Sequence, residues 1–102
     1  MKKFEEIERK GNEIVVGMGA TGRYWTDCYP FEVVRVISDK TVEIRALDEK
    51  MISGDWLDAE YEYYVNESHP VERVRKTKMG WKTKDGMRVG FGGARYYRDP
   101  SF

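Results

Sequence analysis

The sequence predicts an all-β fold, either a small SH3-like barrel or a compact two-sheet sandwich of six to seven strands. Three observations favour this fold class. The chain has 102 residues, which is enough for one domain, 1–102, with a modest core. Short runs rich in β-branched and aromatic residues follow one another from residue 13 onward, separated by turn-forming residues. No internal repeat and no linker interrupts these runs.

The N-terminal segment is the least regular part of the pattern. Phe4 and Ile7 lie three residues apart among helix-forming residues, and Gly11 follows where a helix would stop. This segment is therefore either a short helical turn packed on the body or a frayed arm. The apolar residues 14–16 predict a first short strand.

A hairpin of residues 30–38 and 41–47 is the most secure structural prediction. The first run is rich in β-branched residues. In the second run Val42, Ile44 and Ala46 alternate with polar side chains. Two residues, Asp-Lys, separate the runs, which is the spacing of a tight turn, although the favoured glycine is missing.

The remaining runs predict the rest of the sheet. Residues 48–59 are a loop or an extension of the hairpin, and residues 61–65 are a strand. Residues 71–79 predict a bent edge strand, whose lysines would guard against aggregation. Residues 81–84 and 87–91 predict a second hairpin around an Asp-Gly turn.

Residues 17–22 spell G-x-G-x-x-G directly after an apolar run, which raises the question of a nucleotide-phosphate site. A dinucleotide-binding glycine loop leads into a helix, but here an aromatic stretch follows and ends at Pro30. No kinase motif follows either. We therefore interpret the match as coincidental. We expect these glycines to provide positive φ and close backbone approach, which lays Tyr24 and Trp25 across the barrel. A backbone-amide concavity that holds an anion stays open as an alternative.

The formal net charge of zero hides a strong asymmetry along the chain. Residues 43–70 carry two basic and eight acidic side chains, whereas residues 71–102 carry nine basic and three acidic ones. One interpretation is that these parts pair as neighbouring strands and neutralise each other. The other is a molecule with one acidic and one basic face, which suits an anionic ligand or head-to-tail association.

Cysteine and histidine usage argues against several kinds of chemistry. Cys28 is the only cysteine, so no internal disulfide can form, and a reducing, cytoplasmic location is expected. One cysteine and one histidine, His69, do not make a metal site, and we expect no metal and no cofactor. We interpret Cys28 as structural and His69 as a surface or capping residue. No apolar run is long enough for a membrane span, and we expect no membrane partner.

Three groups combine aromatic and basic side chains: residues 23–25, Trp81 with Lys82, and residues 95–98. This is the chemistry of base stacking and phosphate neutralisation, and also of protein–protein hot spots. The competing interpretation is that half of these rings fill the core. Asp27 lies in an aromatic setting and is either a site carboxylate or a turn residue. The predicted ligand-binding residues are Arg23, Tyr24, Trp25, Asp27, Trp81, Arg95, Tyr96, Tyr97 and Arg98. We expect them to form one pocket, across a homo-oligomer interface.

The chain also resembles a set of small uncharacterised proteins of bacteria and bacteriophages. The resemblance rests on VGMGAT, on W-x-D followed by the PFEVV strand, and on the ending G-x-x-R-Y-Y-R-D-P-S-F. It covers roughly residues 1–45 and the last 25 residues, and the middle is not matched. Cys28 stands where the set usually has an arginine. No activity is established for the set, so the resemblance implies a phage context and no catalytic residues.

These observations predict a binding protein rather than an enzyme. The first expectation is a phage-type protein that sequesters a small anionic, nucleotide-like signal of host defence. The alternative is a nucleic-acid-binding module of SH3-like or OB-like type, favoured by the basic segment 71–102. A third expectation is an inhibitor that binds a host defence protein.

Overall fold

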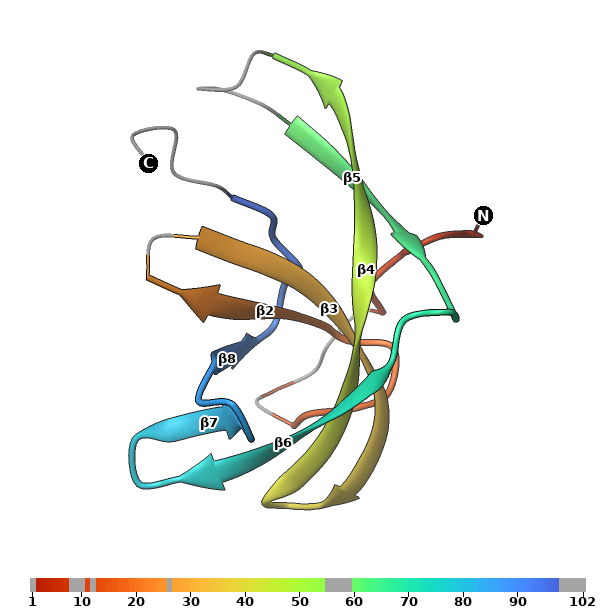
Figure 1. Cartoon of the computed structure of the whole chain (residues 1–102). Helices are drawn as coiled ribbons and strands as arrows, with labels where there is room; N and C mark the ends of the chain where they lie inside the picture. The colour runs from red at the N-terminus through yellow and green to blue at the C-terminus, as the bar shows by residue number, and fades with distance from the viewer. Residues whose placement is uncertain (1, 8–10, 12, 26, 55–59, 98–102) are drawn as a thin grey trace.

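The structure, a computed structural model, describes residues 2–7, 11, 13–25, 27–54 and 60–97. These residues form an all-β fold, as predicted, in which every strand pairing is antiparallel (Figure 1). The strands are β1 (Lys2–Lys3), β2 (Gly19–Tyr24), β3 (Asp27–Ser38), β4 (Thr41–Ser53), β5 (Glu60–Val65), β6 (Val71–Thr77), β7 (Gly80–Thr83) and β8 (Arg88–Phe91).

Six of these strands close into a barrel. The sheet order is β1-β5-β4-β3-β2-β8-β7-β6, and β6 pairs a second time with β4. That extra pairing joins the end of the series β4-β3-β2-β8-β7-β6 to its beginning, so the structure favours the barrel over the sandwich. The predicted hairpin of residues 30–38 and 41–47 is confirmed and forms the β3–β4 wall.

Strand β4 belongs to two parts of the molecule. Its first half, residues 41–45, pairs with β6 in the barrel, and its second half, residues 47–53, pairs with β5. Residues 47–53 together with β5 project beyond the barrel, away from the β6–β7 turn (Figure 1). We call this projection the arm. Strand β1, which has only two residues, pairs with β5 and so adds a strand to the edge of the arm.

The barrel interior holds the hydrophobic core, which explains the alternation of apolar and polar residues along the strands. Val33, Val42, Ile44 and Val74 are each at most 1% exposed and come from β3, β4 and β6. The buried cluster consists of Met18, Ala20, Phe31, Val33, Val42, Ile44, Val74, Met87 and Val89.

The glycine motif lies in strand β2, and the predicted strand 14–16 is wrong. Residues 13–15 have no regular structure, and the chain turns at Gly17, whose φ is +92°. Gly19 and Gly22 instead allow close packing. A Cβ on Gly19 would lie 2.7 Å from the backbone nitrogen of Ala94, and one on Gly22 would lie 2.5 Å from Sδ of Met87. The expected close approach is therefore confirmed, and the motif leads into a hairpin rather than a helix.

Two further expectations need correction. Residues 71–77 are not an edge strand, because β6 pairs with β4 on one side and with β7 on the other. No helical turn forms in the described N-terminal residues. There, residues 2–3 pair with β5, and the amide of Ile7 donates to the carbonyl of Gly17 at 3.3 Å. Of the loop or hairpin extension expected from residues 48–59, the extension is present as far as residue 53, where β4 ends, and Trp56 lies outside the described residues.

The C-terminal segment fastens the arm to the barrel. Tyr97 exchanges two backbone hydrogen bonds with Cys28 on β3, at N–O distances of 2.6 and 2.9 Å. The ring of Tyr96 makes edge contacts with Tyr29 of β3 and Tyr61 of β5, with centroids 6.4 and 5.0 Å apart. These contacts bridge the two parts where β4 has left the barrel wall.

Candidate functional site

Four basic side chains occupy directly opposite positions on four neighbouring strands of the barrel. Arg23 on β2 is the register partner of Arg88 on β8, and Arg88 is the partner of Lys82 on β7. Lys82 is in turn the partner of Arg75 on β6. We call Arg23, Arg88, Lys82 and Arg75 the cation row.

All four side chains point away from the core, because their sequence neighbours point into it. Gly22, Val74, Thr83 and Val89 are buried, and each lies next to one member of the cation row. Successive side chains of a strand alternate between the two faces, so the members of the row share the outer face. Arg23, Arg75 and Arg88 are exposed and Lys82 is half-buried.

This arrangement is electrostatically unfavourable for the protein alone. Like charges directly opposite each other on antiparallel strands destabilise a sheet. Among the residues that the structure describes, no carboxylate lies within ion-pair distance of a member of the cation row. By contrast, neighbouring Arg73 pairs with Glu43 of β4 at 3.4 Å. A bound anion would relieve the repulsion along the row.

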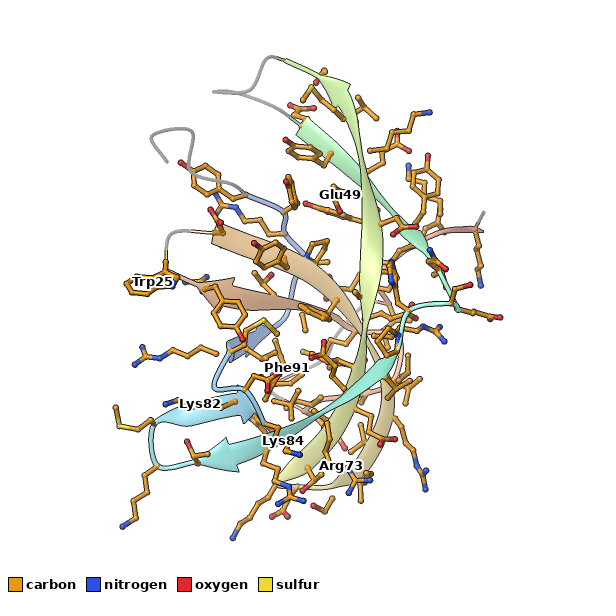
Figure 2. All side chains as sticks on the ribbon, in the orientation of Figure 1. Trp25, Glu49, Arg73, Lys82, Lys84 and Phe91 are labelled. Atoms are coloured by element: carbon orange, nitrogen blue, oxygen red, sulfur yellow. The ribbon has the colours of Figure 1, made fainter. Side chains whose placement is uncertain are left out.

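Two grooves follow the cation row. The first, which we call the basic groove, has a volume of about 560 Å³. Figure 2 shows Arg73, Lys82 and Lys84 of this region near the β6–β7 end of the barrel. Apart from two threonines, every residue lining it is a cation. The lining residues are Arg73, Arg75, Thr77, Lys82, Thr83 and Lys84.

The second groove, which we call the hairpin-tip groove, lies beside the turn between β2 and β3. It has a volume of about 500 Å³ and combines two arginines of the row with two aromatic residues. Lys82 of the basic groove and Arg88 of this groove are register partners, so the linings of the two grooves are adjacent at the middle of the cation row. The lining residues are Arg23, Tyr24, Trp25, Gly86 and Arg88.

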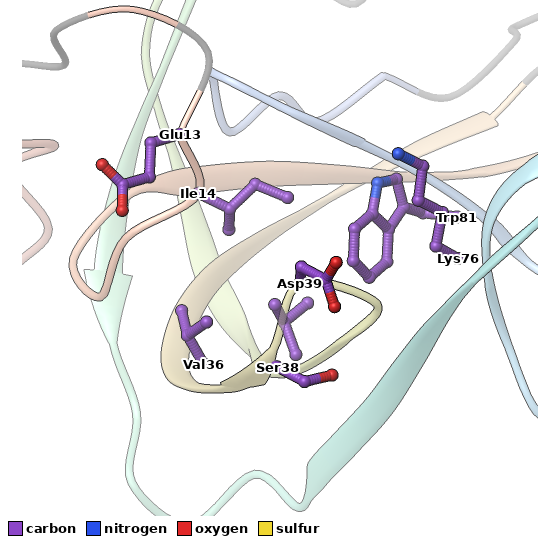
Figure 3. A pocket seen from close by; sticks show the side chains of 8 residues that line it. Glu13, Ile14, Val36, Ser38, Asp39, Lys76 and Trp81 are labelled. Carbon is purple, nitrogen blue, oxygen red and sulfur yellow. The ribbon is translucent and has the colours of Figure 1, made fainter.

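The structure brings together Arg23, Tyr24 and Trp25 of the predicted site, but it does not add Trp81 to them. Trp81 packs edge-on against Phe91, with ring centroids 5.3 Å apart, and lines a separate cavity of about 420 Å³ (Figure 3). The expectation that Trp25 lies across the barrel is wrong, because this residue is 96% exposed at the hairpin tip.

The other predicted residues lie toward the arm. Tyr96 packs between barrel and arm, which is the role of a structural ring. The guanidinium of Arg95 lies 5.8 Å from the ring centre of Tyr97. Asp27 begins β3 and accepts a 3.4 Å hydrogen bond from the hydroxyl of Tyr29. Arg98 lies outside the described residues.

The sequence prediction missed Arg75 and Arg88, and it grouped Lys82 with Trp81. The two residues of that pair point to opposite faces of β7, since Trp81 packs on the core and Lys82 lies in the row. The alternation of apolar and basic residues in β6 and β8 was the available signal. It identifies outward-facing cations, but the strand order is needed to align them.

The charge asymmetry is realised mainly as two separate regions. Glu43 of β4 pairs with Arg73 of β6, as the strand-pairing interpretation expects, and also with Arg35 of β3. The acidic residues of the arm are not near the cation row. Figure 2 shows Glu49 on the arm and Lys82 toward the opposite end of the molecule. The outer face of β6–β7 is therefore locally basic in a chain with no net charge.

Cys28 and His69 do not form a catalytic pair. Cys28 is half-buried beside Tyr97, as expected of a structural cysteine, whereas Nε2 of His69 donates to Oδ1 of Asp48 at 2.6 Å. Asn66 also donates to this carboxylate, at 2.8 Å. The hydrogen bonds from His69 and then Asn66 hold the pKa of Asp48 below its ordinary value of 3.8.

We expect the Asp48 contact to contribute to acid sensitivity. A carboxylate whose pKa is lowered by folding stabilises the fold above its unfolded pKa, and this stabilisation is lost as pH falls through the folded value. The free energy of unfolding, measured in urea at about pH 6 and about pH 3, should fall less for Asp48→Asn than for the parent. Glu67→Gln, which removes a carboxylate from the turn that carries Asn66 and His69, is the control. An acid loss equal to the parent's in Asp48→Asn would contradict the prediction.

Within the described ranges, no group of three or more His, Cys, Asp or Glu side chains is placed to hold a metal ion. The same residues include no helix that could cross a membrane. Comparisons with protein-family models, with curated proteins and with solved structures found no match for this chain.

Proposed function

We propose that this protein binds nucleic acid through the phosphate backbone. The observation that carries the proposal is the cation row, in which four basic residues stand in register on four adjacent strands. Adjacent strands lie ~4.8 Å apart, so the row extends over roughly 14 Å. That span suits a chain of phosphates better than a single phosphate group. Backbone binding of this kind is independent of sequence and is driven by counterion release.

The dependence of affinity on salt tests this function. We expect a fluorescent single strand of about 20 nucleotides to bind with a slope of log K against log salt of roughly −3, because four contacts each contribute about −0.7. Arg75→Gln and Arg88→Gln should each weaken binding and reduce the slope by about 0.7. The measurement is fluorescence anisotropy between about 50 and 200 mM salt.

Lys50→Gln is the matched control, because it removes one positive charge from the arm rather than from the barrel face. This variant should keep the parent's slope. A parent that does not bind at low salt, or row variants that behave like Lys50→Gln, would contradict the proposed function.

A second candidate is the capture of a small nucleotide-like anion, which the hairpin-tip groove favours. Its volume of about 500 Å³ lies in the range of small-molecule sites, and it offers two arginines beside two aromatic rings. The protein would then sequester such a signal of host defence, in line with the phage context that the sequence resemblance implies. A mononucleotide that binds as tightly as the oligonucleotide would favour this candidate over backbone binding. We place either function in the cytoplasm, as the single cysteine predicts.

A further inference from the structure

We propose that the nucleic acid is single-stranded and that Trp25 provides the surface on which an unpaired base stacks. This inference rests on the proposed function and specifies its ligand. Trp25 is 96% exposed, and it stands at the tip of the β2–β3 hairpin (Figure 2). Its φ of +51° is a left-handed conformation, and it is the only non-glycine residue with positive φ in the described part of the chain.

Both properties of Trp25 are unfavourable for folding. A bulky residue with positive φ is a backbone outlier, and such strain is concentrated at functional sites. A fully exposed indole also gives up the large hydrophobic gain that burial would provide. The three ring–ring contacts in the described structure involve other aromatic residues, so no neighbouring ring covers this one. The exposed indole is therefore available to a ligand.

The position of Trp25 relative to the cation row specifies the kind of strand. The ring lines the hairpin-tip groove together with Arg23 and Arg88, which form one end of the row. A strand whose phosphates follow the row toward Lys82 can thus place a base at Trp25. Paired bases are already stacked within a duplex, whereas unpaired bases are free to stack on aromatic side chains. The combination of a basic track and an exposed ring favours a single strand.

Three nucleic-acid probes of about 20 nucleotides per strand separate phosphate binding from base stacking. They are oligothymidine, a DNA duplex, and an abasic single strand that keeps the phosphates. The variant Trp25→Gly removes the ring and relieves the positive φ, so it should fold at least as well as the parent. Trp25→Phe keeps an aromatic face. Ile52→Ala, which shortens an exposed apolar residue of the arm, is the control.

We expect Trp25→Gly to weaken binding to oligothymidine by roughly 5- to 100-fold and to leave binding to the abasic strand unchanged. Trp25→Phe should recover most of the loss, and Ile52→Ala should cause none. Binding of oligothymidine should quench the fluorescence of Trp25, and this part of the quenching should be absent in Trp25→Phe. The parent should bind oligothymidine more tightly than the duplex.

The outcomes distinguish this inference from the proposed function. Base stacking on Trp25 is wrong if Trp25→Gly binds oligothymidine as tightly as the parent does. It is also wrong if the parent binds the duplex and the abasic strand as tightly as it binds oligothymidine. Neither result would contradict phosphate binding by the cation row. If Arg88→Gln leaves the affinity for the abasic strand unchanged, backbone binding by the row is itself wrong.

Discussion

Replacing Ile44 with alanine is expected to lower the free energy of unfolding by ~2–5 kcal/mol. Ile44 is 0% exposed and lies on the barrel half of β4, opposite Val33 of β3. Its loss leaves a cavity among side chains from different walls of the barrel, which cannot move together without opening the sheet. Because a domain is stable by only ~5–15 kcal/mol, this single change removes a large part of the total. Urea unfolding followed by tryptophan fluorescence measures it.

Ile52→Ala is the matched control, because it makes the same change on the same strand. Ile52 is 49% exposed on the arm, so its truncation should change stability by no more than ~0.5 kcal/mol. Equal effects of the two variants would show that the barrel half of β4 does not enclose the core.

Replacing Lys82 with glutamate is expected to change stability and binding in opposite directions. Lys82 lies between Arg75 on one side and Arg88 on the other. A glutamate there turns two repulsive cross-strand pairs into attractive ones, each worth ~0.2–1 kcal/mol, so the variant should be more stable than the parent. Nucleic-acid affinity should fall roughly 10- to 100-fold, because one charge-assisted contact of ~1.5–3 kcal/mol is lost. Urea unfolding and anisotropy titration measure the two effects.

Lys50→Glu on the arm makes the same change in net charge with the opposite expectation for stability. Lys50 is the register partner of Glu62, so a glutamate at residue 50 places two carboxylates opposite each other and should destabilise the sheet. Its affinity for nucleic acid should fall much less than that of Lys82→Glu. If both variants lose stability, or both lose the same affinity, the cation row has no special role.

The sequence predicted local pairing well and global closure poorly. Alternation within residues 30–38 and 41–47 identified the β3–β4 hairpin, because both strands bury one face and are joined by a short turn. The barrel is closed by β6, whose residues 71–75 pair with residues 41–45. Nothing local in residues 71–79 identifies that distant partner, so the segment looked like an edge. The sequence predicts positive φ and close approach for the glycines of residues 17–22, but it does not show which glycine serves which purpose: Gly17 has the positive φ, whereas Gly19 and Gly22 have the close contacts.

The candidate site was predictable in part for the same reason. Arg23, Tyr24 and Trp25 are adjacent in the chain, so their combination was visible from the sequence. Arg88 and Lys82 join them only through strand order and register. Trp81 was misplaced because it was grouped with Lys82 by residue type alone. Adjacent residues of a β-strand face opposite sides of the sheet, so Trp81 and Lys82 cannot line the same face of one pocket.

Barrel closure also has a consequence for how the protein emerges during synthesis. Strand β2, residues 19–24, pairs on one side with β3 and on the other with β8, residues 88–91. The second partner leaves the ribosome about 70 residues later, which at ~5–20 residues per second is a delay of several seconds. During this interval one edge of β2 has no strand to pair with, and Arg23 has no Arg88 beside it. The cation row is therefore assembled late, so a nascent chain carries little of this basic surface until its barrel can close.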